Sequence, residues 1–152
     1  MAEQEPPDNV VELRARALRL LARREHTRQE LERKLSPHAG SANDLRDLIS
    51  GLTRKNQFSE ERYAEARARQ LSRKYGAARI RQELQAKGVP EDLVASYASP
   101  EDELQRARAI LDRKYRTQAA TREEKAKRMR FLQSRGFSSA VIFTLLSARS
   151  AD

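Results

Sequence analysis

Arginine and lysine are the side chains of this sequence best suited to chemistry with a partner. The 152 residues include 31 Lys and Arg against 22 Asp and Glu, which gives a net charge of +9. Arg greatly outnumbers Lys, and a guanidinium group binds phosphate or carboxylate through paired hydrogen bonds. The excess positive charge therefore indicates a polyanionic partner, either a nucleic acid or an acidic protein surface.

The basic residues concentrate in three segments. Residues 67–90 contain seven Lys or Arg residues and a single acidic residue, Glu83, and residues 106–135 form a second concentration. A smaller group surrounds residue 27. From the first two segments we predict an interface made by Arg67, Arg69, Arg73, Lys74, Arg79, Arg81, Lys87, Lys127, Arg128, Arg130 and Arg135. A secondary basic patch is predicted at Arg23, Arg24, Arg28, Arg33 and Lys34.

No group of residues has the composition of a catalytic or metal site. The two histidines, His26 and His38, are predicted to be exposed polar residues near loops, without acidic or His neighbours at ligand spacing. The sequence has no cysteine and no glycine-rich phosphate loop. Glutamate pairs at 60–61 and 123–124 are explained by the positive ends of helices. We therefore expect no enzymatic activity, no metal and no cofactor.

Helices must position the basic residues, because good helix formers dominate the sequence and only five Pro and five Gly interrupt them. Thr27 and Glu30 form a predicted capping box, and Ser59 before two glutamates is a second helix start. Apolar residues recur at helical spacing, which predicts eight or nine helices and no strand. Four tyrosines at core spacing are predicted to lie in the core or at seams between helical units: Tyr63, Tyr75, Tyr97 and Tyr115.

A helix–break–helix pattern recurs three times. The copies span residues 17–35, 66–88 and 128–146. Aligned on their last apolar pairs, they place Thr27, Gly76 and Phe137 at the break. Such recurrence is typical of arrays of small helical units. We predict an all-α fold, an elongated and curved tandem array of three-helix repeats, with a disordered tail at 1–9 and repeats at 10–56, 57–98 and 99–152.

The sequence contains no feature of a membrane or exported protein. The opening residues MAEQEPPDNV have no apolar core, so no signal peptide is expected. No run of about 18 apolar residues is present for a membrane span. Together with the absence of cysteine, this predicts a cytoplasmic protein. The absence of a long heptad seam predicts a monomer.

Three segments resemble the signatures of the RecX family, small proteins that modulate the RecA recombinase. ALRLLARREHTRQELERKL is similar to the opening signature, FSEERYAEARARQLSRKYGAARIRQELQAKGV to the central one, and KRMRFLQSRGFSSAVIFTLL to the C-terminal one. His26 stands where the family often has an aromatic residue. The resemblance implies tandem three-helix repeats, and a RecA filament on single- or double-stranded DNA as the partner. It also implies inhibition of strand exchange, of ATP hydrolysis and of the co-protease activity that triggers the SOS response.

Two alternatives stay open at the level of sequence. A basic helical protein that binds nucleic acid by itself would act by covering DNA, and its affinity would fall steeply with salt. A scaffold that uses its basic face for acidic proteins alone would ignore DNA.

Overall fold

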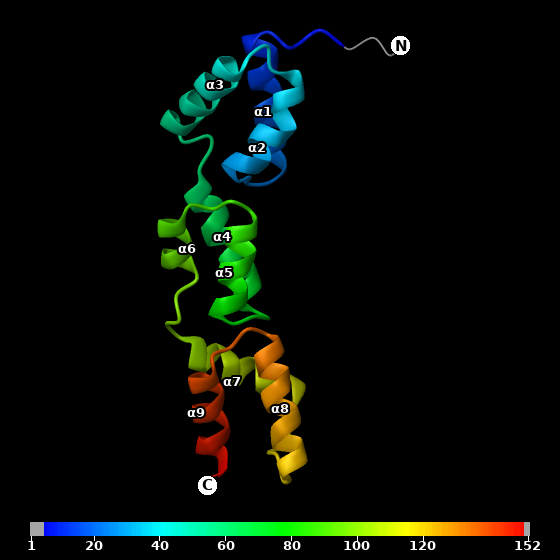
Figure 1. Cartoon of the computed structure of the whole chain (residues 1–152), viewed down its shortest axis with the longest axis vertical. Coiled ribbons are helices and arrows are strands. Elements are labelled where there is room, and N and C mark those ends of the chain that lie inside the picture. Colours follow the sequence, from blue (N-terminus) through cyan, green and yellow to red (C-terminus); the bar gives the residue numbers. More distant parts are fainter. Residues whose placement is uncertain (1–4, 151–152) are drawn as a thin grey trace. The chain divides into compact units, whose positions relative to one another are not determined.

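The computed structural model describes residues 5–150, with side chains described through residue 147. Over this range the chain forms nine α-helices, one short 3-10 helix and no strand (Figure 1). The predicted all-α fold is confirmed. Residues 1–4 of the predicted tail lie outside the described range. The chain divides into two compact units: the first holds residues through Ala64 together with Lys87–Val89, and the second holds Glu65–Ala86 and the residues from Pro90 onward.

The first unit is built on three helices. They are α1 (Val10–Arg23), α2 (Arg28–Leu35) and α3 (Ala42–Arg54), and the 3-10 helix η1 (Ser36–His38) precedes α3. Each of the three α-helices packs against the other two. Their apolar stripes face inward and form one core, whose buried members include Leu13, Ala17, Leu31, Leu35, Ile49, Leu52 and Phe58.

Side-chain caps fix where these helices begin. Asn9 accepts a hydrogen bond from the Glu12 amide at 2.8 Å, and Thr27 accepts one from the Glu30 amide at 3.1 Å. In both cases the glutamate carboxylate returns a bond to the capping residue's amide. Ser41 caps α3 through the Asp44 amide. The predicted capping box at Thr27 is confirmed, and it satisfies amides that a helix start leaves unpaired.

The second unit contains the remaining helices. They are α4 (Glu60–Ser72, of which residues 65–72 belong here), α5 (Ala77–Ala86), α6 (Glu91–Tyr97), α7 (Glu103–Lys114), α8 (Arg122–Ser134) and α9 (Ser139–Ser150). In this unit α9 packs on both α7 and α8, as Figure 1 shows. The core between these three helices includes Ala107, Ile110, Leu111, Leu132, Phe137, Ile142 and Leu145.

Two helix breaks meet within the second unit. Gly76 lies between α4 and α5, and its amide donates to the Arg135 carbonyl at 2.7 Å, just before the break between α8 and α9. A Cβ on Gly76 would lie 2.5 Å from the carbonyl oxygen of Gly136. Gly136 has φ +87°, and a Cβ there would lie 2.6 Å from the Cβ of Arg79. Only glycine allows the two backbones to approach so closely, which brings two distant basic segments together.

Candidate functional site: a basic groove beside α7 and α8

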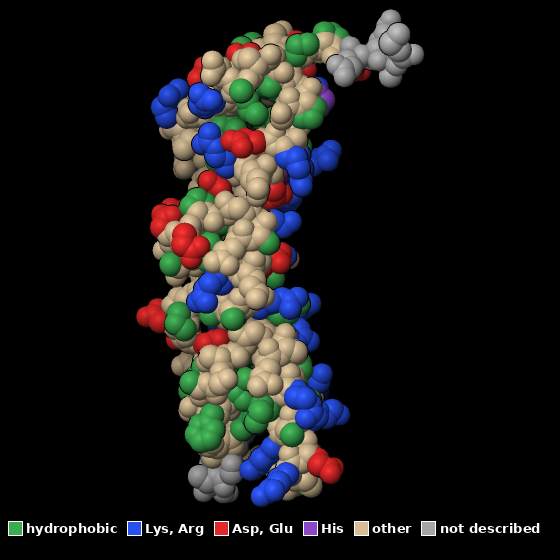
Figure 2. Space-filling view, viewed as in Figure 1, with side chains coloured by type: hydrophobic (Ala, Val, Ile, Leu, Met, Phe, Trp, Pro, Cys, Tyr) green, Lys and Arg blue, Asp and Glu red, His purple; other side chains and the backbone are tan. Residues whose placement is uncertain are grey.

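An open groove of about 460 Å³ lies on the second unit. Five cationic and two apolar residues line it, and none of the lining residues that the structure describes is acidic. In Figure 2, Lys and Arg side chains recur along one side of this unit. We call this feature the basic groove; its lining residues are Arg73, Lys74, Ile110, Arg113, Lys114, Phe131 and Arg135.

Aromatic rings hold two cations of the basic groove in place. The Lys114 Nζ lies 4.3 Å from the centroid of the Phe131 ring, and the Arg135 Cζ lies 5.2 Å from the same centroid. Tyr115 meets Phe131 edge-on, with 6.1 Å between ring centroids. A cation within about 6 Å of an aromatic face is attracted to the ring, and the contact leaves its charge intact. Phe131 therefore orders two cations without neutralising them.

Backbone and ring contacts order two more guanidinium groups. Arg113 Nη2 donates to the Arg73 carbonyl at 2.7 Å, which ties the end of α7 to the segment after α4. Arg79 and Arg135 both lie over the Tyr75 ring, with Cζ at 5.0 and 5.5 Å from its centroid. A carbonyl or a ring satisfies part of a guanidinium and leaves its full charge. These groups keep N–H donors for an incoming anion.

The electrostatics of the groove favour a ligand with several negative charges. Its five cations repel one another, and no carboxylate among the described lining residues offsets them. An anion that enters the groove relieves this repulsion and accepts hydrogen bonds from the ordered cations. A phosphodiester chain, or a run of carboxylates, supplies such charges at regular spacing.

The structure brings together only part of the predicted interface. Arg73, Lys74 and Arg135 line the basic groove. Arg79 stacks on Tyr75, next in sequence to Lys74. The other exposed members of the predicted set do not line the groove; they are Arg69, Arg81, Lys87, Lys127 and Arg130.

Three predicted interface residues are engaged within the fold. Arg67 pairs with Glu83 at 2.8 Å, and Arg69 pairs with Glu65 at 2.9 Å. Arg128 is only 5% exposed, and its Cζ lies 4.5 Å from the centroid of Tyr115. It therefore supports the ring that contacts Phe131 below the groove. Because a buried guanidinium cannot reach a ligand, we leave Arg128 out of the proposed interface.

The secondary patch is largely used inside the first unit. Arg24 pairs with Glu30, and Arg28 pairs with Glu32 at 2.8 Å. Lys34 Nζ lies 2.9 Å from a ring nitrogen of His26. The remaining members of the patch, Arg23 and Arg33, are exposed.

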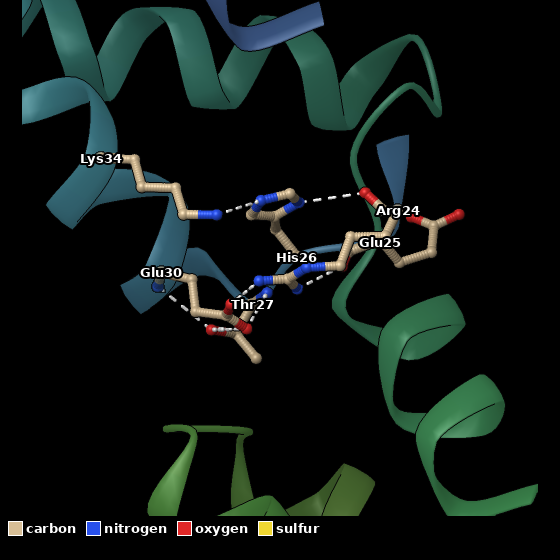
Figure 3. A network of polar contacts seen from close by, with 6 residues as sticks. All are labelled: Arg24, Glu25, His26, Thr27, Glu30 and Lys34. Atoms are coloured by element: carbon tan, nitrogen blue, oxygen red, sulfur yellow. Dashed lines mark hydrogen bonds and ion pairs between the residues drawn. The ribbon is translucent and has the colours of Figure 1, made fainter. Parts of the chain in front are cut away.

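His26 is buried, so the prediction that it is an exposed residue is wrong. It is 1% exposed, with Nδ1 3.0 Å from the Arg24 carbonyl and Nε2 facing Lys34 (Figure 3). An ammonium group only donates, so Nε2 accepts and Nδ1 carries the proton. Burial, together with the charges of Arg24 and Lys34, lowers the pKa of His26. Burial alone would raise the pKa of Glu30, but its bonds to Arg24 and Thr27 lower it overall.

Sequence reasoning did not select Arg113, Lys114 and Phe131 as site residues. The first two stood inside the basic segment 106–135, but composition alone does not show which of its cations share a surface. A signal was present on α8, where Phe131 and Arg135 are four residues apart and so lie on one helix face.

Two other kinds of feature, a metal site and a membrane span, are absent from the described residues. No cluster of three or more His, Cys, Asp or Glu residues could hold a metal ion there. Within the same range, no helix combines the length and apolar character needed to cross a membrane.

Family models of RecX match most of the chain. The first three-helix domain of RecX matches residues 14–38, the second matches 59–96, and the third matches 101–146. The regulatory protein RecX of Leptothrix cholodnii is 43% identical over 142 residues, which cover 92% of this chain and 89% of the relative. The Neisseria gonorrhoeae protein of the same name is 41% identical, with 88% of each covered.

Solved structures show the same fold. The crystal structure of RecX from Lactobacillus salivarius superimposes with a TM-score of 0.79, covering 94% of this chain and 97% of that one at 20% identity. A second crystal structure, of a regulatory protein RecX, gives a TM-score of 0.67 at 23% identity, covering 91% of this chain and 74% of that one.

Proposed function

This chain belongs to the RecX family of regulatory proteins, and we propose that it is a negative regulator of RecA that binds the RecA filament on single-stranded DNA. In this proposal, binding inhibits ATP hydrolysis, strand exchange and the co-protease activity of the filament. The match to all three RecX domains carries the proposal. Its relatives are named regulatory proteins, which fits a role without catalysis.

The basic groove is the surface we assign to the filament. Its five cations would contact DNA phosphates or acidic side chains of RecA. The aromatic contacts of Lys114 and Arg135 support this assignment, because cations that are already ordered lose less conformational entropy when a ligand binds. Other exposed cations of the same unit add long-range attraction; they are Arg79, Arg81, Lys127 and Arg130.

Regulation of this kind needs differential binding and no chemical step. A protein that binds one form of the filament more tightly than another shifts the population toward the favoured form. If the favoured form hydrolyses ATP slowly, ATPase activity falls with occupancy. A small amount of regulator is then sufficient wherever one bound molecule affects several RecA subunits.

The test is the DNA-dependent ATPase of RecA, titrated with this protein at fixed RecA and fixed single-stranded DNA. We expect inhibition at a small fraction of the RecA concentration. The triple variant R113Q/K114Q/R135Q should need a higher concentration for the same inhibition. Its control, R46Q/R54Q/K55Q, removes three exposed cations of the first unit and should inhibit like the wild type. No inhibition by the wild type would overturn the proposed function.

The second candidate function is autonomous binding of nucleic acid, which the five cations of the groove and the lack of an acidic residue among its described lining residues favour. A protein of this kind would inhibit RecA only near saturation of the DNA. Extra DNA would then restore ATP hydrolysis, because it would draw the protein away. The titration therefore separates the two functions directly.

A further inference from the structure

The surface of α9 carries more apolar residues than the fold covers. No charged residue occurs between Ser139 and Ala148, and apolar side chains occur on every side of the helix. A helix that is apolar all round is normally buried all round. Ile142 and Leu145 do face the core, whereas Phe143 is 72% exposed. Part of this helix therefore presents an apolar surface of the kind that marks a binding site.

A pocket of about 360 Å³ lies where this surface meets α8. Its volume is within the range of about 300–1,000 Å³ that is usual for ligand pockets. Figure 2 shows hydrophobic side chains gathered over α9 and its border with α8. Met129, which is 42% exposed, lines one side of the pocket with a flexible side chain that can adjust to a ligand. We call this the apolar pocket; its principal lining residues are Lys125, Met129, Gln133, Ile142, Phe143 and Leu146.

The edge of the apolar pocket is positively charged. Lys125 is its one charged lining residue among those described. Arg122 lies three residues earlier on the same face of α8 and is exposed. The carboxylate of Glu124 accepts a bond from the Ala120 amide at 2.6 Å, so it is occupied at the start of the helix. A second copy of this chain would bring an identical positive edge into contact, and the two edges would repel each other. An acidic segment of another protein would instead be attracted to this edge.

We propose that the apolar pocket docks a segment of a partner protein that carries one large apolar side chain beside an Asp or Glu. The apolar side chain enters between Met129 and Phe143, and the carboxylate pairs with Lys125. The docking contact goes beyond the proposed function, because it is a contact with protein at a site separate from the basic groove.

Helix α8 separates the two sites by its periodicity. Lys125, Met129 and Gln133 recur every four residues and line the apolar pocket. Phe131 and Arg135 are offset by two residues from that series and line the basic groove. Residues two apart point in different directions on a helix, so one helix presents a polyanion site and a protein site on different faces. A partner made of both nucleic acid and protein matches this arrangement.

The experiment measures binding of the full chain to two labelled peptides by fluorescence anisotropy. Both peptides are acidic and equal in charge; one has a central Phe and the other a central Ser. We expect the Phe peptide to bind about tenfold more tightly, since burying one aromatic ring contributes at least this factor. The variant M129Q/F143Q should lose this preference, whereas K125E should weaken the binding of both peptides because both carry the carboxylate. The controls R46E and T144Q alter exposed residues outside the pocket and should retain the preference; R46E makes the same charge change as K125E and should weaken binding less.

Equal binding of the two peptides, or no binding of either, would overturn the docking site. Retention of the preference in M129Q/F143Q would do the same. Sedimentation equilibrium tests whether a second copy of this chain occupies the pocket. A dimer of the wild type that dissociates in the F143Q variant would identify that second copy as the occupant and contradict the proposal. RecA is absent from these measurements, so their result is independent of the proposed function.

Discussion

At the scale of single residues, the same side chain has different roles because its surroundings differ. Arg128 is buried on a tyrosine ring, Arg67 is paired with Glu83, and Arg135 lies over two aromatic rings at the basic groove. All three were selected from the sequence for their charge. Charge is visible in a sequence, whereas burial and pairing depend on residues that are distant along the chain. The sequence therefore predicts a class of partner, whereas the individual contacts of each arginine depend on the fold.

His26 makes the stability of the first unit depend on pH. Its folded-state pKa lies below the unfolded value of about 6.5, so the folded state binds fewer protons around that pH. Its contribution to stability is complete above the unfolded pKa, and it is lost as the pH falls from there toward the folded pKa. We expect the free energy of unfolding, measured with urea, to be lower at pH 5.5 than at pH 7.5.

The variant H26Q tests the source of this pH dependence. Glutamine keeps an acceptor for Lys34 but does not titrate, so the change between the two pH values should shrink. H38Q, which removes the other histidine, is the matched variant for comparison. An unchanged pH dependence in H26Q would assign the effect to other groups.

At the scale of helices, glutamates at two helix starts have a second role. The Arg28 amide at the start of α2 donates to Glu60 at 3.2 Å, and the Ala77 amide at the start of α5 donates to Glu103 at 3.2 Å. In both cases the first residue of a later helix caps an earlier one. The sequence predicted the interaction of Glu60 with the dipole of its own helix. It could not predict the second partner, because that partner is brought close only by tertiary packing.

The aligned helix–break–helix pattern was only partly correct. The first two copies fall on α1–α2 and α4–α5, the opening helices of the first two matched domains. The third copy falls on α8–α9, whereas the third domain match begins at residue 101, before α7. Phe137 is therefore not equivalent to Thr27 and Gly76. The alignment failed because a helix break followed by an apolar pair is not unique to one junction of the repeat. The repeat boundaries at 10–56, 57–98 and 99–152 stay predictions.

Replacing Gly76 tests the contact between the two helix breaks. In G76A the added Cβ would meet the backbone of Gly136, which cannot move aside as a side chain would. Overpacking of this kind costs about 1–3 kcal/mol. We expect a lower melting temperature by circular dichroism and a lower urea midpoint.

The matched control is Gly51, which lies inside α3. A Cβ there would approach only the Arg54 side chain, at 3.8 Å. Because alanine is a better helix former, G51A should stabilise the protein by about 0.5–1 kcal/mol. Equal effects of the two substitutions would show that the Gly76 contact does not limit stability.

At the scale of the whole chain, the charged surfaces that internal contacts leave uncovered determine what the protein can bind. Part of the basic charge predicted for the interface and the secondary patch is compensated internally, as at Arg67 in the first set and at Arg24 and Arg28 in the second. The basic groove differs because aromatic rings and a backbone carbonyl, rather than carboxylates, order three of its cations, Arg113, Lys114 and Arg135. Tyr75 and Tyr115, predicted to be core or seam residues, are half-buried and carry cations on their faces. The net charge of +9 predicts a polyanionic partner, and the fold determines which cations such a partner could reach.

The salt dependence of DNA binding reports how many phosphates the basic groove contacts. For a single strand, the logarithm of affinity falls by about 0.7 for each decade of salt and each phosphate contact. R113Q/R135Q removes two groove cations, so its slope in anisotropy titrations should be shallower than the wild-type slope by about 1.4. R46Q/K55Q removes equal charge from the first unit and should leave the slope unchanged. If both variants shift the slope equally, the overall charge of the protein governs DNA binding. If neither variant shifts the slope, DNA phosphates do not enter the basic groove, and acidic side chains of RecA become the ligand assigned to the groove.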